Sequence, residues 1–225
     1  MVIPCHRAVC LQKWAEGGYA SALSIRFFAS VIGSMDTGIA WSSGLELTLP
    51  TKKSEADFIL WYQRKKILDL DRPTQIVFGE AKSFGKEAFE EKDMERMKIL
   101  AESFPGSILV FSTMKNHEEL SKTEISRLKK MAEWGREYDK ERRQTRAPVI
   151  VLTGTELFAA HYLTQAWEDK GGKHKELISH GWVRTENLRV LADLTQQLYL
   201  GLQPYHSWYE AKWKKRDARR NSLSK

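Results

Sequence analysis

The sequence predicts an α/β sandwich in which a mixed central sheet is flanked by helices. Residues 55–62 and 76–79 form apolar runs with the length of core strands. Residues 108–111 and 149–152 are short and fully apolar, which is typical of parallel strands buried on both faces. Charged segments with helical periodicity lie between these runs. The order helix, strand, strand, strand, helix, strand therefore predicts an αβββαβ core.

The first part of the chain predicts a helix followed by a β-hairpin. Residues 19–34 carry apolar side chains at helical spacing, so we expect an amphipathic helix there. Residues 45–49 alternate apolar and polar side chains, as a half-buried strand does, and a short turn leads from them into the strand over 55–62. The polar connection over 63–74 is expected to be a loop that delivers the chain to the strand ending at Lys82.

The rest of the chain predicts helices that alternate with buried strands. Pro105 and Gly106 close the first of these helices, and Gly154 ends the last strand. Gly171 and Gly172 mark a turn between the final two helices. We expect helices over 88–104, 118–146, 157–169 and 185–200.

Length and composition favour one main domain. A chain of 225 residues can bury a single sizeable core, which we place at 19–205. Residues 1–18 form a separate N-terminal segment that ends at a pair of glycines. Residues 206–225 form a basic C-terminal tail with no apolar period beyond Trp213, so we expect it to fray. This tail either follows a phosphate backbone or is simply solvated.

The N-terminal segment contains the chain's two cysteines, Cys5 and Cys10, with His6 beside the first. A structural zinc site needs four ligands, and these residues offer at most three, two of them adjacent. Two free thiols and the remnant of a truncated zinc ribbon both remain open.

The net charge of +7 favours a polyanionic partner, and nucleic acid is the first candidate. No apolar stretch approaches the length of a membrane span, so we expect no membrane association and a cytoplasmic location.

Charged side chains interrupt two of the predicted core strands. Glu80 and Lys82 directly follow the run 76–79, and Asp57 lies in the preceding strand. Side chains alternate along a strand, so Glu80 and Lys82 share one face, about 6.5–7 Å apart. Ionised groups in such surroundings cost several kcal/mol unless they are paired, solvated or bound to metal. The pattern favours a functional site; the alternatives are a solvent-facing edge strand for Glu80 and Lys82, and an Asp57 paired with Lys53.

Asp57 together with Glu80-Ala81-Lys82 resembles the PD-(D/E)xK nuclease superfamily, whose fold is restriction-endonuclease-like. The resemblance covers roughly residues 19–151. It implies a metal-dependent nuclease in which Asp57, Glu80 and the Ala81 carbonyl hold Mg²⁺ or Mn²⁺. Lys82 would orient the attacking water or stabilise the phosphate in the transition state. The implied activity is hydrolysis of nucleic acid, first of all by a DNA endonuclease of restriction, defence or repair.

The chain departs from the family pattern in its first helix, which contains no carboxylate over 19–34. Glu46 and Glu55 are candidates for additional ligands. Lys86, Lys92 and Arg96 are candidates for contacts with the phosphate backbone.

A different class of function therefore stays open beside the nuclease. Under this alternative, the chain is a catalytically inactive module of the same fold that binds nucleic acid or another protein. Assembly as a homodimer or within a larger defence complex is open in both cases.

Overall fold

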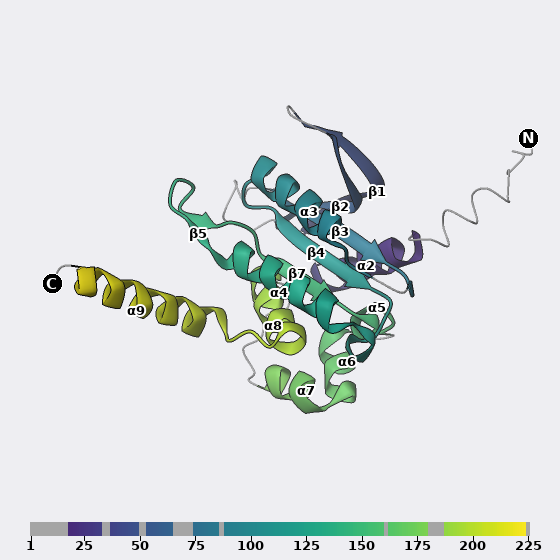
Figure 1. Cartoon of the computed structure of the whole chain (residues 1–225). Coiled ribbons are helices and arrows are strands. Elements are labelled where there is room, and N and C mark those ends of the chain that lie inside the picture. The colour runs from purple at the N-terminus through teal and green to yellow at the C-terminus, as the bar shows by residue number, and fades with distance from the viewer. Residues whose placement is uncertain are drawn as a thin grey trace, which may run out of the picture.

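The protein forms a five-stranded mixed sheet between two layers of helices (Figure 1). The computed structural model describes residues 18–32, 37–49, 53–64, 74–85, 88–159, 162–179 and 187–223. The strands of this sheet are β1 (Thr37–Thr48), β2 (Lys53–Arg64), β3 (Gln75–Lys82), β4 (Ile108–Thr113) and β7 (Val149–Leu152). They lie in the order β1-β2-β3-β4-β7, so that β3 is the central strand.

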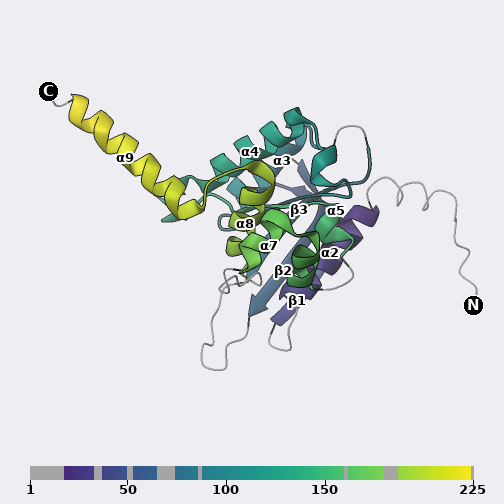
Figure 2. The ribbon, with the colours of Figure 1, turned by 90° about the horizontal axis from the view of Figure 1, so that it is seen from below.

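The helices are α2 (Tyr19–Ile32), α3 (Glu91–Ser103), α4 (Lys122–Arg136), α5 (Gly154–Leu157), α6 (Leu163–Lys170), α7 (Gly172–Ser179), α8 (Leu188–Leu200) and α9 (Tyr205–Leu223). Figure 2 shows the sheet between α3 and α4 on one side and α2 and α5 on the other. Each face has its own apolar core. Phe78 of β3 packs in the core with Met97 of α3, whereas Val77 belongs to the opposite core with Phe28 of α2 and Trp167 of α6.

The predicted α/β sandwich and its αβββαβ order are confirmed. The first two strands form the expected hairpin, and β3 pairs antiparallel with β2. β4 lies parallel to β3 and β7 parallel to β4, with every residue of β4 and β7 buried. The central position of β3 excludes the alternative that Glu80 and Lys82 stand on an edge strand.

The predicted long helix over 118–146 is wrong. The chain instead forms a 3-10 turn (His117–Glu119), then α4, and then a small hairpin of β5 (Tyr138–Asp139) and β6 (Gln144–Thr145). The helix begins only at Lys122 because Ser121 and Glu124 form a capping box in front of it. It ends at Arg136 because the chain folds back, so that the Ala147 amide donates to the Gly135 carbonyl at 3.1 Å.

Two further predictions need correction. The single helix expected over 157–169 is two helices, because Phe158 and Tyr162 have non-helical backbone angles at the end of α5 and the start of α6. The C-terminal segment expected to fray is helical through Leu223 in α9. Aromatic contacts at its base, from Tyr205 to Trp208 and to Tyr209, support the first turns.

The other helices lie close to their predicted positions. α3 begins at Glu91 and α8 at Leu188, three residues later than expected in each case. After the predicted turn at Gly171 and Gly172, the chain forms an additional short helix, α7, which the sequence pattern did not predict. Cys5, His6 and Cys10 lie outside the described residues. No helix in the described part of the chain is long and apolar enough to cross a membrane.

Candidate active site

The pairing of β2 with β3 brings Asp57 next to Glu80. The paired register of the two antiparallel strands ends at Phe58 opposite Gly79. The residue before Phe58 on β2 is Asp57 and the residue after Gly79 on β3 is Glu80, so the two acids come next on the two strands. Gly79 makes this approach possible, because a Cβ atom there would lie 2.0 Å from the Phe58 ring. The absence of a side chain at position 79 therefore lets the two strands and their acids come together.

Asp57 is held by the backbone of the strand that carries Glu80. The Ala81 amide donates a hydrogen bond of 2.7 Å to Asp57 Oδ2. Along a strand, the N–H and C=O of one residue point to the same neighbouring strand. We therefore expect the Ala81 carbonyl to face the β2 side, where Asp57 lies. The next carbonyl, that of Lys82, faces the other way and accepts from the Met114 amide at 3.0 Å.

Glu80 is fully buried and only half of its carboxylate has a partner. Its Oε1 accepts a hydrogen bond of 2.7 Å from Arg96 Nη2 and lies 2.5 Å from Lys82 Nζ. Its Oε2 is buried with no hydrogen-bond partner among the described residues. Burial, followed by the charge of Asp57, raises the pKa of Glu80 to about 7, although Lys82 and Arg96 act in the opposite direction.

Helix α3 adds two residues to this cluster, Asp93 and Arg96. Asp93 is buried and lies 2.9 Å from Arg96 Nη2 and 3.6 Å from Lys82 Nζ. It also accepts a hydrogen bond of 2.9 Å from the Glu90 amide at the start of the helix. The sequence prediction missed Asp93, although its spacing from Glu90 is that of a helix-capping pair.

Lys82 remains a cation in these surroundings. Burial acts to lower its pKa, but the charges of Glu80, Asp93 and Asp57 outweigh burial, and the net effect is a raised pKa. Its side chain is 30% exposed, so it is the member of the Glu80–Lys82 pair that solvent or a ligand can reach. A charged, partly exposed amine suits a role as a fixed positive charge and not as a proton acceptor.

The three residues predicted to contact phosphate differ in their positions relative to the cluster. Arg96 lies inside the cluster, where it pairs with Glu80 and Asp93. Lys92 is exposed and pairs with Glu90 at 2.7 Å. Lys86 lies outside the described residues. Binding of phosphate by these three residues stays a prediction.

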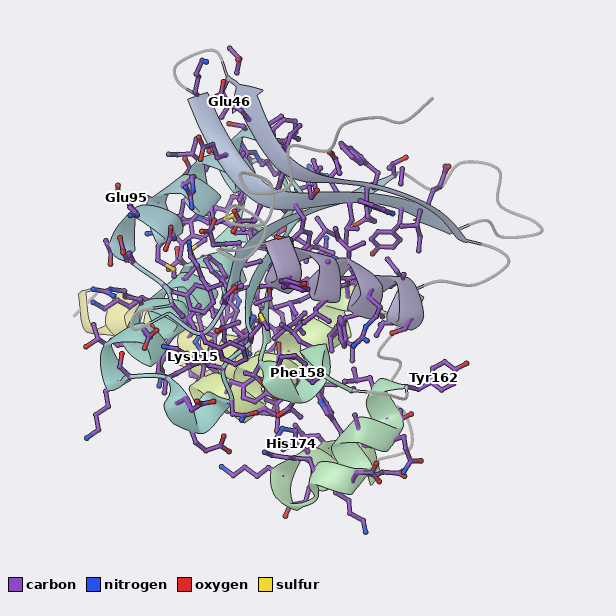
Figure 3. The ribbon with its side chains drawn as sticks, turned by 90° about the vertical axis from the view of Figure 1, so that its right-hand side faces the viewer. Glu46, Glu95, Lys115, Phe158, Tyr162 and His174 are labelled. Carbon is purple, nitrogen blue, oxygen red and sulfur yellow. The ribbon has the colours of Figure 1, made fainter. Side chains whose placement is uncertain are left out.

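The two candidates for additional ligands differ in their distance from the cluster. Glu55 is exposed, and its Oε2 lies 3.8 Å from Arg96 Nη1. Glu46 lies near the end of the β1–β2 hairpin, away from the centre of the sheet (Figure 3), and pairs with Lys53 at 2.6 Å. Among the described residues Lys53 pairs with Glu46, whereas Asp57 accepts its hydrogen bond from the Ala81 amide, so the predicted alternative of a Lys53–Asp57 pair is not formed.

Helix α2 contributes hydroxyl groups and no carboxylate. Ser24 donates to Ser112 Oγ on β4 at 2.8 Å, and Ser112 in turn donates to the Glu80 carbonyl at 3.4 Å. Among the described residues, no three His, Cys, Asp or Glu side chains gather as a metal site. The oxygen donors that the strands offer are therefore two carboxylates and a backbone carbonyl. Oxygen donors suit Mg²⁺, and Glu80 Oε2 provides one that no other described residue of the chain binds.

Among the comparisons with known proteins, only the comparison with solved structures finds a match. No protein-family model matches the chain, and no curated protein matches it. Among solved structures the chain is similar to the MspJI restriction endonuclease in complex with a 27-mer oligonucleotide, with 17% identity and a TM-score of 0.39 over 80% of this chain. The chain spans 36% of the length of that protein chain. The mixed five-stranded sheet with helices on both faces is the architecture that the sequence predicts.

Proposed function

We propose that this chain is a nuclease that uses Mg²⁺ or Mn²⁺ to hydrolyse phosphodiester bonds of nucleic acid. DNA is the first substrate to test, and endonucleolytic cleavage in restriction, defence or repair is the proposed setting. One observation carries the proposal: buried Glu80 lies beside Asp57, with one carboxylate oxygen held by Lys82 and Arg96 and the other without a partner among the residues that the structure describes.

Asp57, Glu80 and the Ala81 carbonyl would hold the metal ion. When bound, the ion would act as a Lewis acid that lowers the pKa of a water molecule and neutralises charge on the scissile phosphate. The protein prepares for this by keeping Glu80 next to two cations, which favour its ionised form.

Lys82 would contribute a positive charge to the reacting phosphate or orient the attacking water. Arg96 and Asp93 act through other residues, because Arg96 fixes Glu80 Oε1 and Asp93 lies against both Arg96 and Lys82. They are positioning residues in this scheme.

A catalytically inactive module that binds nucleic acid or protein is the second candidate. Helix α2 supplies no carboxylate over Tyr19–Ile32, which favours this candidate because it leaves few acids for a metal. Both cations of the cluster are also engaged by carboxylates of the chain itself.

A cleavage assay on matched substrates tests the proposal. Supercoiled plasmid, linear duplex, single-stranded DNA and RNA are each incubated with Mg²⁺, with Mn²⁺ and with EDTA. We expect metal-dependent cutting that Asp57→Asn and Lys82→Ala each reduce by about 100-fold or more, a loss typical of removing one group that stabilises the transition state. Circular dichroism and thermal unfolding verify that both variants fold.

Matched control variants come from exposed positions on other helices. Asp169→Asn in α6 and Lys175→Ala in α7 make the same chemical changes at exposed side chains and should leave cutting unchanged. Undiminished cutting by Lys82→Ala would contradict the proposal. Binding that persists in EDTA, with no nicking under any divalent metal, would instead support the inactive module.

A further inference from the structure

Two phenylalanine rings lie exposed and parallel at the edge of the sheet where β3, β4 and β7 end. Phe84 is 61% exposed and Phe158 is 52% exposed. Their ring centroids are 6.3 Å apart and their planes differ by 5°. More than half of the surface of each residue is therefore in water, and the two rings together form one contiguous apolar surface, a feature that marks binding sites when it is large enough.

The two rings are anchored by the ends of three strands. The Met114 amide, just after β4, donates to the Lys82 carbonyl at the end of β3, and the Gly154 amide, just after β7, donates to the Lys115 carbonyl at 2.8 Å. A Cβ atom at Gly154 would lie 2.8 Å from the Met114 carbonyl oxygen, so a glycine permits this close crossing. Phe84 and Phe158 follow these linked ends in the chain, and the Phe158 ring lies 3.4 Å from the position that a Cβ atom of Gly154 would occupy.

Phe84 lies within the length of one nucleotide of the candidate active site. It follows Lys82 by two residues, so the two Cα atoms are at most about 7 Å apart. Lys82 is a partly exposed cation of the Glu80 cluster. A nucleotide whose phosphate lies at Lys82 can therefore place its own base, or the next one, against the Phe84 ring.

Positive charge lies on both sides of the ring pair. Arg26 of α2 is exposed, and its guanidinium donates to the carbonyls of Leu157 and Ala159, at 2.6 and 3.3 Å, on either side of Phe158. Within the described part of the chain, Arg26 forms no ion pair with a carboxylate. Lys82 provides the cation on the Phe84 side. An apolar surface between two cations matches a nucleotide, which has an apolar base face and an anionic phosphate.

We propose that Phe84 and Phe158 form a stacking platform for an unpaired base of the substrate strand beside the cleaved phosphate. The inference deepens the proposed function and rests on it for the position of the phosphate. Because the rings carry no hydrogen-bonding groups, the platform accepts any base. The substrate class is therefore single-stranded or locally unpaired nucleic acid, in preference to a fully paired duplex.

Binding of fluorescent oligonucleotides in EDTA tests the platform without cleavage. A single strand that carries 2-aminopurine, the fully paired duplex and a duplex with one unpaired 2-aminopurine are titrated with the whole protein. We expect quenching of 2-aminopurine by stacking in the first and third probes. Phe84→Ala and Phe158→Ala should each weaken binding of these two probes by about 5- to 150-fold, the range for the loss of one aromatic stacking contact.

Two further variants separate stacking from general apolar contact. Phe84→Leu keeps apolar area without an aromatic face and should lose quenching, whereas Phe84→Trp should retain it. Tyr162→Ala is the matched control, because Tyr162 is 75% exposed and points away from Phe158 in Figure 3. The Tyr162→Ala variant should bind the oligonucleotides with the same affinity as the unaltered protein and quench 2-aminopurine to the same extent.

Several results would overturn the inference. The first is that the unaltered protein binds no oligonucleotide. The second is that Phe84→Leu binds and quenches as the unaltered protein does. The third is that Phe84→Ala and Phe158→Ala lose as much affinity for the paired duplex as for the single strand. A change in molar mass by light scattering for the Phe84→Ala/Phe158→Ala variant, without a change in oligonucleotide affinity, would assign the rings to contact with a second copy of the chain.

The platform and the nuclease activity can fail independently. If the unaltered protein quenches 2-aminopurine and never cuts with any metal, the proposed function is wrong and the platform stands. If it cuts in a manner that depends on Lys82, while Phe84→Ala retains affinity and KM, the platform is wrong and the proposed function stands.

Discussion

At the scale of single residues, Gly79 sets how closely β2 can approach the strand that carries Glu80. The position has no side chain, and the Phe58 ring fills the space that a Cβ atom would occupy. We expect Gly79→Ala to destabilise the protein by about 1–3 kcal/mol, the usual cost of an overpacked core. Urea denaturation measures this loss.

A double-variant cycle checks the cause of that loss. Phe58→Ala removes the ring, so Gly79→Ala should cost much less in that background than in the unaltered protein. Equal costs in both backgrounds would show that the Phe58 ring is not the obstacle.

The buried carboxyl of Glu80 predicts a pH dependence of stability in the metal-free protein. Its folded-state pKa of about 7 lies above its ordinary value of 4.5. The contribution of Glu80 to stability is therefore fully present below pH 4.5 and is lost as the pH rises through about 7. The difference between these two pKa values corresponds to a loss of about 3 kcal/mol in the free energy of unfolding.

Urea denaturation in EDTA across this pH window tests that dependence. Glu80→Gln cannot ionise and should flatten the decline in the free energy of unfolding. An equally steep decline in Glu80→Gln would assign the pH dependence to other groups.

The sequence singles out Glu80 and Lys82 because a two-residue period places them on one face of a strand without knowledge of the rest of the fold. It singles out Asp57 because this acid lies within the preceding apolar run. It could not identify Asp93 as a neighbour of Lys82, because an acid at a helix start is explained by capping alone. The position of Arg96 is likewise a tertiary property. Its contact with Glu80 depends on how α3 crosses β3, and no local pattern encodes that crossing.

At the scale of elements, Glu156 joins the helices that follow β7. Its carboxylate accepts hydrogen bonds from Trp167 Nε1 of α6 and from the Thr153 amide, both at 2.8 Å, and from the Tyr199 hydroxyl of α8. Burial raises the pKa of Glu156. A buried acid with this many donors serves packing, because each donor would otherwise be left without a partner.

Removal of this carboxylate should therefore loosen three elements together. We expect Glu156→Ala to cost about 2–5 kcal/mol, since buried donors left unsatisfied cost about 1–3 kcal/mol each. Glu168→Ala, at an exposed position of α6, is the control and should have little effect on the free energy of unfolding. Equal stability of the two variants would contradict the role of Glu156.

The strands β3, β4 and β7 were predictable because buried apolar runs of four residues leave few alternatives. The helix over 118–146 was not, because charged residues continue past its true end. The break depends on Asp139, whose Oδ1 accepts from the amides of Glu141 and Arg142 and so forms a local turn. The turn also places Arg143 at a positive φ of 53°, which apolar periodicity does not reveal.

At the scale of the whole molecule, the net charge of +7 predicts salt-dependent binding to nucleic acid. The logarithm of the affinity for a single-stranded oligonucleotide should fall linearly with the logarithm of the salt concentration. Arg26→Ala should reduce that slope by about 0.7, the contribution of one phosphate contact on a single strand. An affinity that is insensitive to salt would contradict an electrostatic contribution to binding.

Helix α9 projects away from the rest of the molecule (Figures 1 and 2). Among the described residues, Arg136 lies 6.0 Å from the Tyr205 ring centroid at its base, and Lys212 pairs with Glu137 at 3.2 Å. At about 1.5 Å per residue, the helix continues for about 16 Å from Lys212 to Leu223. Because the helix is long, a rotation of a few degrees about its first turn would displace its C-terminal end measurably. The distance between two spin labels, one at that end of α9 and one on the sheet, would report such a rotation.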